Sequence, residues 1–186
     1  TSQPITVWLD HALKYSDNTE TEIIARHALK SSGLATTFSN VQPMAVRVLK
    51  SLGVDSKKLT MLDGSGLAQG NRVTARMIAT LLAKAAKPES KLNPMIGYLP
   101  VAGKSGTLAT RFNGANAVAR GSVHAKSGYI PGLYSLAGIV NAKDGTRLAY
   151  AMFARSAEGK SVTYTARPAL DTLATRFYEC GFGLTK

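Results

Sequence analysis

Two short polar triplets contain residue types that could bind an extended substrate carrying a carboxylate. Residues 126–128 read K-S-G and place a cation, a hydroxyl and a glycine together, while residues 16–18 read S-D-N and offer a hydroxyl and an amide. A cation and a hydroxyl at the edge of a strand suit the capture of an extended substrate that carries a carboxylate. Each triplet also has an ordinary explanation, a surface turn for K-S-G and a helix N-cap for S-D-N. The elements that carry the triplets must distinguish between these interpretations.

Three antiparallel strands are predicted around the K-S-G triplet. Residues 121–128 alternate between apolar and polar types, which is the period of a half-buried strand. Two apolar runs follow at 133–142 and 146–154, and an Asp-Gly pair stands between them at 144–145. This pair predicts a tight hairpin, because such turns need positive φ angles. The pattern puts the K-S-G triplet at the end of the first strand.

Helices are predicted on both sides of the S-D-N triplet. Apolar residues at helical spacing cover 4–15, and polar residues 16–20 predict a break with a new N-cap before a second helix that runs through Ser32. Further helices are predicted over 41–52, 71–87 and 165–180, with a loop-rich segment over 88–120. The chain is therefore predicted to be α+β, an antiparallel sheet covered by helices, in a single domain over 1–186.

The composition narrows the classes of partner. The 186 residues are 45% hydrophobic, with a net charge of +12 and a pI near 10.0, which permits a polyanionic partner such as nucleic acid, an anionic membrane surface or a cell wall. Lys and Arg are dispersed beside no nucleic-acid-binding signature, so nucleic acid is not expected. No apolar run reaches about 18 residues, so no transmembrane segment is predicted. Cys180 is the single cysteine and the three histidines are scattered, so no metal or other cofactor is expected.

Four longer blocks resemble one protein family in their order and spacing. They are Y-S-D-N-T-E at 15–20, D-G-S-G-L at 63–67 followed by Asn71, L-P-V-A-G-K-S-G-T-L-A-T-R-F at 99–112, and A-K-S-G-Y-I-P-G-L-Y-S-L-A-G at 125–138. Over essentially its whole length the chain resembles the low-molecular-mass class C penicillin-binding proteins, which are D-alanyl-D-alanine carboxypeptidases and endopeptidases. S-D-N and K-T-G are two of the three motifs of such active-site serine enzymes. The resemblance implies a penicillin-binding, serine β-lactamase-like transpeptidase fold, acylation by peptidoglycan stem peptides and inhibition by β-lactams.

The resemblance also implies catalytic roles for three residues. Ser16 would relay a proton between the lysine base and the leaving D-alanine nitrogen. Asn18 would hydrogen-bond the amide of the substrate and fix its pose. Lys126 would supply the positive potential that keeps the neighbouring lysine deprotonated and attracts the terminal carboxylate.

Substrate-binding roles are implied for the three residues that follow Lys126. Ser127, which replaces the usual Thr and keeps its hydroxyl, would bind the terminal carboxylate. Gly128 would let the acyl chain approach the strand as an added antiparallel partner. Tyr129 stands where Ser or Thr is common, and its backbone N–H would be one donor to the oxyanion.

A pocket for the side chain of the stem peptide is implied at Leu67, Gln69 and Ile130. Gln69 stands where relatives such as actinobacterial enzymes carry an Arg that pairs with a carboxylate on the peptide. Because Gln cannot form that ion pair, an amidated or different side chain is an open alternative as the ligand. Ordinary packing explains the three residues about equally well.

The third motif of the family, S-x-x-K with the nucleophilic serine, does not occur in this sequence. No lysine has a serine three residues before it, and Ser156 is one residue too far from Lys160. The resemblance therefore implies that residues 1–186 are the C-terminal portion of a penicillin-binding domain, whose N-terminal half would carry the nucleophile. A signal peptide would also lie upstream, so we expect an extracytoplasmic location, in the periplasm or the cell wall. The chain alone is expected to be inactive.

Two further segments imitate motifs of the family. Residues 104–106 read K-S-G again, but they follow Pro100 and Gly103 without strand alternation, so the triplet at 126–128 is the predicted strand motif. Residues 89–93 imitate the E-x-x-L-N loop of class A β-lactamases at the wrong distance from S-D-N, and chance is the better explanation. Two other functions stay open: a non-catalytic basic module that binds the cell wall and, less favoured, a β-lactamase.

Overall fold

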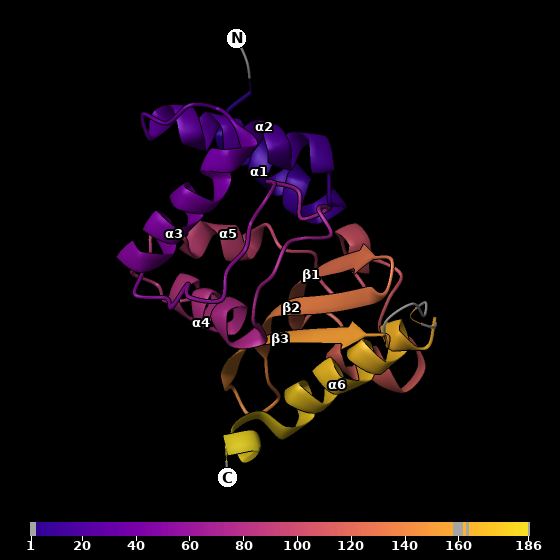
Figure 1. The fold of residues 1–186 in the computed structure, drawn as a ribbon. Coiled ribbons are helices and arrows are strands. Elements are labelled where there is room, and N and C mark those ends of the chain that lie inside the picture. Colours follow the sequence, from indigo (N-terminus) through magenta and orange to yellow (C-terminus); the bar gives the residue numbers. More distant parts are fainter. Residues whose placement is uncertain (1–2, 158–161, 163, 186) are drawn as a thin grey trace.

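Helices precede and follow a small sheet in the computed structural model, which describes residues 3–157, 162 and 164–185 (Figure 1). The α-helices are α1 Ile5–Tyr15, α2 Asn18–Ser31, α3 Val41–Ser51, α4 Ala75–Ala85, α5 Asn93–Gly97 and α6 Ala166–Cys180. The strands are β1 Val123–Ile130, β2 Leu133–Asn141 and β3 Arg147–Arg155. Short 3-10 helices are η1 Phe38–Asn40, η2 Gly106–Leu108, η3 Gly114–Ala119 and η4 Gly181–Thr185. This order confirms the predicted α+β class.

The strands form one antiparallel sheet in the order β1-β2-β3. Gly145, between β2 and β3, takes a φ of +84°, which confirms the predicted hairpin. β1 and β2 are joined by a second tight turn, in which Gly132 takes a φ of +83°. The order leaves β1 at one edge of the sheet.

The prediction that the K-S-G triplet ends the first strand is wrong. β1 continues through Tyr129 to Ile130, and these two residues lie opposite Tyr134 and Leu133 of β2. The ladder persists because the turn to β2 is tight: only residues 131–132 separate Ile130 from its partner Leu133. The triplet therefore lies inside a paired strand, where cross-strand contacts hold its backbone.

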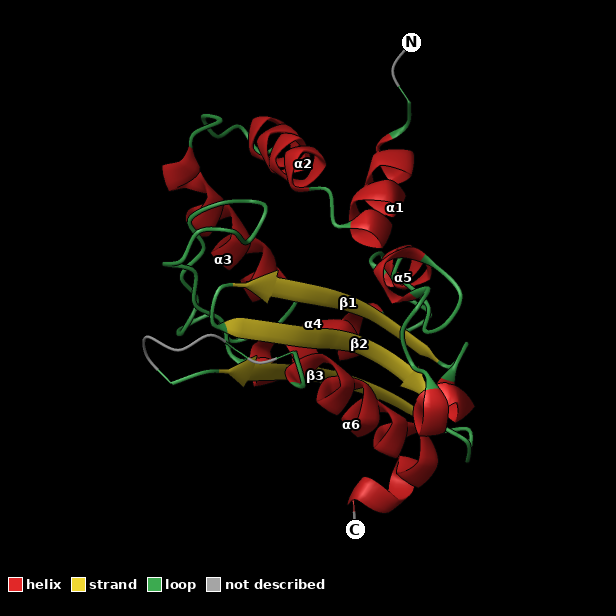
Figure 2. Cartoon of the chain, turned by 90° about the vertical axis from the view of Figure 1, so that its right-hand side faces the viewer, coloured by secondary structure: helices red, strands yellow, loops and turns green. Residues whose placement is uncertain are grey.

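Helices cover both faces of the sheet, as predicted (Figure 2). On one face α6 packs through Leu170 and Ala174 onto Leu136 of β2. On the other face α4 and α5 supply Ala85 and Ile96, which pack against Ile139 of β2. Both views show α1 and α2 beyond the β1 edge of the sheet.

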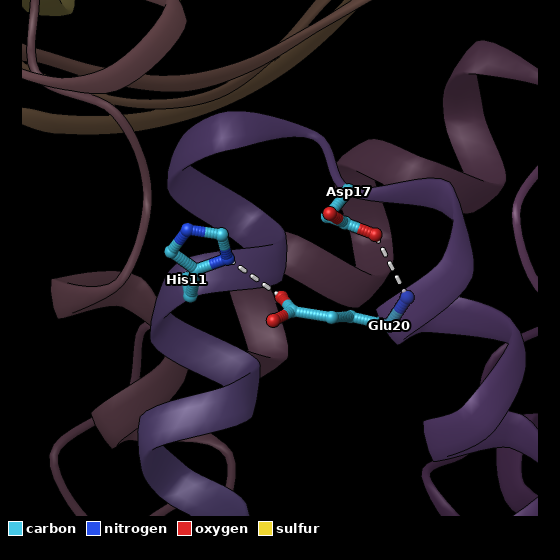
Figure 3. A group of neighbouring side chains, drawn as sticks. All are labelled: His11, Asp17 and Glu20. Atoms are coloured by element: carbon cyan, nitrogen blue, oxygen red, sulfur yellow. Dashed lines mark hydrogen bonds and ion pairs between the residues drawn. The ribbon is translucent and has the colours of Figure 1, made fainter.

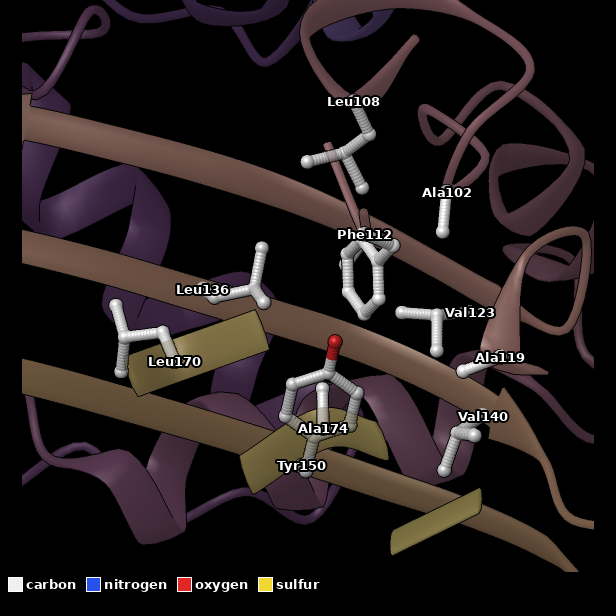
Figure 4. Packing of buried hydrophobic residues seen from close by; sticks show 11 residues of the cluster. Ala102, Leu108, Phe112, Ala119, Val123, Leu136, Val140, Tyr150, Leu170 and Ala174 are labelled. Carbon is white, nitrogen blue, oxygen red and sulfur yellow. The ribbon is translucent and has the colours of Figure 1, made fainter. Parts of the chain in front are cut away.

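The main hydrophobic core lies between the sheet and α6 (Figure 4). Phe112 is 1% exposed and lies among residues of β1, β2 and α6. The Phe112 backbone has a φ of 60°, a conformation that few residues other than glycine adopt. Its burial among several elements compensates for the strain of this backbone conformation.

The predicted helix over 71–87 begins later than expected. α4 starts at Ala75, and the Thr74 side chain caps it by accepting a hydrogen bond from the Met77 N–H at 3.1 Å. Asn71 lies outside the helix and bonds instead to the turn that precedes it, donating to Asp63. Residues 88–120 contain short helices and turns, in agreement with the prediction. Among the described helices, none has the length and apolar character needed to cross a membrane.

Candidate active site

The S-D-N triplet forms a tight turn between α1 and α2. Ser16 closes α1 in the left-handed conformation, with φ 61° and ψ 46°, and α2 begins at Asn18. Asp17 is the N-cap of α2, because its side chain accepts a hydrogen bond from the Glu20 N–H at 2.9 Å. The capping interaction therefore belongs to Asp17 and leaves the Ser16 hydroxyl and the Asn18 amide for other contacts. Ser16 and Asn18 are both exposed.

The structure brings the two triplets into direct contact. Lys126 Nζ donates to Ser16 Oγ at 2.7 Å, across 110 positions of sequence, and also to the Ser127 carbonyl at 2.8 Å. The Lys126 side chain is only partly exposed to solvent. Burial lowers the pKa of Lys126 from 10.5 to about 8, because the charged ammonium loses hydration. An ammonium with a lowered pKa therefore lies beside a serine hydroxyl.

Strand geometry directs the Ser127 side chain away from that of Lys126, and Gly128 has no side chain. Successive side chains of a strand alternate between faces, so Ser127 points away from the face that carries Lys126. Ser127 Oγ lies 2.9 Å from Thr107 Oγ1 of η2. A Cβ atom at Gly128 would lie 2.5 Å from Ser135 Oγ on the adjacent strand, so the Ser135 hydroxyl would have to move to admit a side chain there. Gly128 thus leaves room for the Ser135 side chain against the backbone of β1.

Among the described residues, backbone hydrogen bonds cover the outer edge of β1 along its first half. The Ala125 N–H donates to the Pro100 carbonyl at 2.8 Å, and the Ala102 N–H donates to the Val123 carbonyl at 2.9 Å. Backbone groups two residues apart point the same way in a strand, so those of Ser127 and Tyr129 face this same outer edge. The edge at Ser127 and Tyr129 therefore presents backbone groups in the orientation that an added strand would need.

The Tyr129 side chain lies on the surface next to this edge. It is 61% exposed, and its ring packs against that of Tyr134 with centroids 4.7 Å apart. This cross-strand aromatic contact accounts for the side chain without a ligand. The predicted role of Tyr129 rests on its backbone N–H alone.

Segment 104–108, in which the second K-S-G triplet lies, connects the two halves of the candidate site. The structure places residues 104–106 outside the strands, as predicted. Ser105 Oγ accepts from the Val101 N–H at 3.0 Å and closes the turn. η2 contacts both α1 and β1. Sequence reasoning missed Thr107, although it lies in the block 99–112 that resembles the penicillin-binding proteins.

Leu67 and Gln69 lie on the loop between α3 and α4. Leu67 is 51% exposed, Gln69 is exposed, and the backbone carbonyl of Gln69 accepts from Arg72 at 2.7 Å. Ile130 is half-buried at the end of β1. Leu67 and Gln69 lie on a different segment from Ile130, which pairs with Leu133 of β2, so the side-chain pocket that the three would share stays a prediction.

A turn in the same loop is closed by the Asp63 carboxylate and tied to α2 by the Glu22 carboxylate. Asp63 accepts from the Gly66 and Ala68 N–H groups at 3.0 and 2.8 Å and from Asn71 at 2.7 Å. Burial opposes the charge of Asp63, but these hydrogen bonds outweigh it and hold the pKa of the carboxyl below its usual value. Glu22 of α2 accepts from the backbone N–H groups that follow Asp63, at 2.8 and 2.9 Å.

A group of three side chains beside Ser16 has the types that could hold a metal ion (Figure 3). Within the part of the chain that the structure describes, one such group occurs, with the ligand atoms of His11, Asp17 and Glu20 within 4.8 Å of one another. His11 Nδ1 lies 2.8 Å from Glu20 Oε2, and Asp17 caps α2. A hydrogen bond between His11 and Glu20 and the Asp17 cap account for these contacts, which brace α1 against α2 around Ser16.

A second ionisable side chain faces the same side of β1 as Lys126. His124 lines a pocket of about 220 Å³ with Asn93, Asn141 and Arg147. Burial lowers the pKa of His124, and the charges of Arg147 and Lys104 act in the same direction. His124 is therefore expected to be neutral at neutral pH.

Comparison with known proteins identifies a family for the chain. Residues 1–177 match the model of the D-Ala-D-Ala carboxypeptidase 3 (S13) family. The chain is 34% identical over 185 residues to carboxypeptidase DacB of Mycolicibacterium smegmatis, and this alignment covers 98% of this chain and 39% of the relative. It is 35% identical over 138 residues to a D-alanyl-D-alanine carboxypeptidase of Actinomadura, covering 72% of this chain and 25% of that protein. The chain thus spans less than half the length of these relatives.

Solved structures agree with the sequence comparison. Penicillin binding protein 4 (dacB) of Haemophilus influenzae superposes with a TM-score of 0.81 at 25% identity, over 96% of this chain and 40% of that one. The TLA-1 β-lactamase superposes with a TM-score of 0.68 at 16% identity, which shows the shared fold alone. These comparisons confirm the resemblance to D-alanyl-D-alanine carboxypeptidases and the predicted penicillin-binding fold. The chain belongs to the D-Ala-D-Ala carboxypeptidase 3 (S13) family.

Proposed function

We propose that this chain forms one wall of the active site of a serine-type D-Ala-D-Ala carboxypeptidase or endopeptidase. The enzyme would act on peptidoglycan stem peptides through an acyl-enzyme and would be inhibited by β-lactams. The observation that carries the proposal is the 2.7 Å contact between Lys126 Nζ and Ser16 Oγ, in a chain of the S13 family. The contact joins the end of α1 to β1, two elements whose contacting residues are 110 positions apart in sequence.

The geometry suits Ser16 to proton relay. An ammonium can only donate hydrogen bonds, so Ser16 Oγ accepts from Lys126 and its own proton points elsewhere. That proton is then available to a leaving amine nitrogen, and Ser16 would recover a proton from the base that activates the nucleophile. Asn18, two residues further along at the start of α2, would hold the amide of the substrate.

The strand would bind the acyl part of the substrate. An extended peptide would pair with the outer edge of β1 at Ser127 and Tyr129, and Gly128 would allow its close approach. The Ser127 hydroxyl would bind the terminal carboxylate, with the charge of Lys126 nearby. The Tyr129 N–H would donate to the oxyanion, a contribution worth about 3–4 kcal/mol in barrier for comparable donors.

The remaining machinery would come from a segment outside this chain. The S-x-x-K motif, with the nucleophilic serine and its lysine base, would lie in the N-terminal half of the domain. The peptide side chain would contact Leu67, Gln69 and Ile130. An extracytoplasmic location, in the periplasm or the cell wall, follows from the substrate. In support, penicillin binding protein 4 of Haemophilus influenzae has been solved in complex with a β-lactam.

Acylation by a labelled penicillin tests the proposal in the full-length protein. The parent should form a stable covalent adduct, and Lys126→Ala should slow adduct formation about 100-fold or more, the effect of removing a preorganised electrostatic contact. Lys143→Ala, in the β2–β3 turn, removes an exposed lysine and should acylate like the parent. A parent that forms no adduct, or a Lys126→Ala variant that reacts at the parent rate, would refute the proposal.

A non-catalytic module that binds the cell wall is the second candidate, favoured by the net charge of +12. Binding to purified wall sacculi that weakens with salt, without any penicillin adduct, would support it. Rapid turnover of nitrocefin by the full-length protein would instead support a β-lactamase.

A further inference from the structure

Thr107 occupies a rigid position between the two triplets. It is the central residue of η2, and its Oγ1 lies 2.9 Å from Ser127 Oγ. Leu108, which follows it, is 0% exposed and belongs to the main core. Gly106, which precedes it, packs so tightly on the end of α1 that a Cβ atom there would lie 2.4 Å from the Lys14 carbonyl. Both neighbours therefore fix the point from which the Thr107 hydroxyl reaches Ser127.

We propose that Thr107 is a positioning residue that orients the Ser127 hydroxyl and sets a preference for substrates with a free terminal carboxylate. This inference rests on the proposed function and adds to it a residue that acts through Ser127. Thr107 would not need to touch the substrate itself.

Hydrogen-bond directionality gives the physical reason. Each hydroxyl has one proton to donate and can accept with its oxygen lone pairs. A carboxylate only accepts, so Ser127 must donate to it and can no longer donate to Thr107. Thr107 must then donate to Ser127 Oγ. The two hydrogen bonds, from Thr107 to Ser127 and from Ser127 to the carboxylate, therefore run in one direction. Such chains strengthen their members, because each donor is polarised by the next.

A neutral terminus removes this requirement. A carboxamide both donates and accepts, so Ser127 can bind it with its proton pointing either way. The Thr107 hydroxyl would then have little effect on binding. The dependence on Thr107 should therefore be specific to the charge of the substrate terminus.

The test compares two substrates with two variants in the full-length protein. One peptide ends in D-alanyl-D-alanine with a free carboxylate, and the other is the same peptide capped as the carboxamide. Thr107→Val removes the hydroxyl with little change of shape, whereas Thr107→Ser keeps the hydroxyl. The Val variant should lose about tenfold in kcat/KM with the carboxylate peptide, which is the scale of one hydrogen bond in a series that ends on a charged group. With the carboxamide it should lose less than about twofold. The Ser variant should keep the parent ratio between the two peptides.

Thr110→Val is the matched control, since Thr110 is exposed two residues beyond η2 and should behave like the parent. An equal loss with both peptides in Thr107→Val would show a purely structural role and overturn the inference, while the proposed function would stand. A Thr107→Ser variant with the Val phenotype would also overturn it. A parent that processes neither peptide and forms no penicillin adduct would refute the proposed function, and this inference with it.

Discussion

At the scale of single residues, Lys126 is the group in which burial and charge oppose each other. Its pKa is lowered to about 8, so at neutral pH the ammonium is still the main form, although it is easier to deprotonate than an exposed lysine. The charged ammonium can only donate to Ser16 Oγ, whereas a neutral amine at Lys126 could accept from the Ser16 hydroxyl. Protonation of Lys126 therefore determines which way the Ser16 hydroxyl points.

This arrangement predicts how acylation depends on pH. The rate of penicillin acylation should fall as the pH rises above about 8, because the positive charge beside the proposed carboxylate site is then lost. The fall should approach about tenfold per pH unit well above the pKa. Rapid-quench measurement of the labelled adduct from neutral to alkaline pH would record it.

Lys126→Arg is the control for this profile. A guanidinium stays charged over the whole range, so the variant should lose the alkaline fall, whatever its starting rate. A parent profile that stays level well above the Lys126 pKa would contradict the prediction. An identical fall in parent and Lys126→Arg would assign the titration to another group.

At the scale of elements, η2 sets the separation between α1 and β1. Gly106 takes a φ of +55° and lies against the Lys14 carbonyl, while Thr107 reaches Ser127 of β1. The end of α1 carries Ser16, so this one short helix touches both supports of the candidate site. A change in its backbone should move the two triplets apart.

Gly106→Ala tests that role against a control with the same backbone geometry. A Cβ atom would lie 2.4 Å from backbone, so α1 or η2 must shift, and the penicillin acylation rate should fall about tenfold or more. Gly114→Ala introduces the same strain at a φ of +57° but has nothing within 4 Å of its Cβ. It should lose stability alone, by about 1 kcal/mol, and acylate like the parent. Equal acylation rates in the two variants would show that η2 does not set the geometry.

The Asp63 turn positions the loop that carries Leu67 and Gln69. Asp63→Asn keeps the shape but places an NH₂ group where one carboxylate oxygen accepts hydrogen bonds, so unfolding by urea at neutral pH should show a loss of about 2 kcal/mol. The Asp63 pKa is lowered in the folded state, so its stabilisation is present above the unfolded pKa and is lost as pH falls through the folded value. The difference between parent and variant should therefore shrink in acid.

Asp55→Asn is the comparison for this turn. Asp55 also accepts a backbone hydrogen bond, from the Lys57 N–H at 3.0 Å, but it is exposed. Water can replace that contact, so the expected loss is within about 0.5 kcal/mol. Equal losses in the two variants would show that burial of the Asp63 carboxylate contributes nothing.

At the scale of the whole molecule, a buried ion pair fastens α6 to the segment before β1. Arg111 donates to Asp171 from Nη2 at 2.6 Å and from Nε at 3.3 Å, and both side chains are less than a tenth exposed. Tyr150 lies in the main hydrophobic core, which α6 also lines. Burial raises the pKa of its hydroxyl, so the hydroxyl stays neutral. The pair locks two segments that are 60 residues apart in sequence.

Breaking this pair should be costly because a charge would stay behind. Asp171→Ala should lower the free energy of unfolding by about 3–5 kcal/mol, measured by urea denaturation, since Arg111 would remain buried without its partner. Replacing both partners with Arg111→Met and Asp171→Leu should cost much less. Glu179→Ala removes an exposed pair on the same helix and should change stability by less than about 1 kcal/mol. A loss below about 1 kcal/mol in Asp171→Ala would contradict this account.

The sequence by itself determined the local elements and the identity of the two triplets. The Asp-Gly hairpin, the break at S-D-N and the apolar stripes of α1 and α6 follow from backbone preferences and periodicity, which act over a few residues. Local patterns were less reliable at boundaries: α4 began at its Thr74 cap, and β1 ran on to Ile130 because pairing with β2 continued.

Tertiary structure alone decided how the triplets meet. The contact between Lys126 and Ser16 spans 110 positions, and η2 packs against both α1 and β1, the elements that carry the two residues. The same packing turned Thr107, which no local pattern distinguishes, into the partner of Ser127. It also lowered the pKa of Lys126, because burial depends on every element that covers the side chain. Residue types specify the chemistry that a chain can perform, whereas distances and burial, which arise from long-range packing, specify where it can occur.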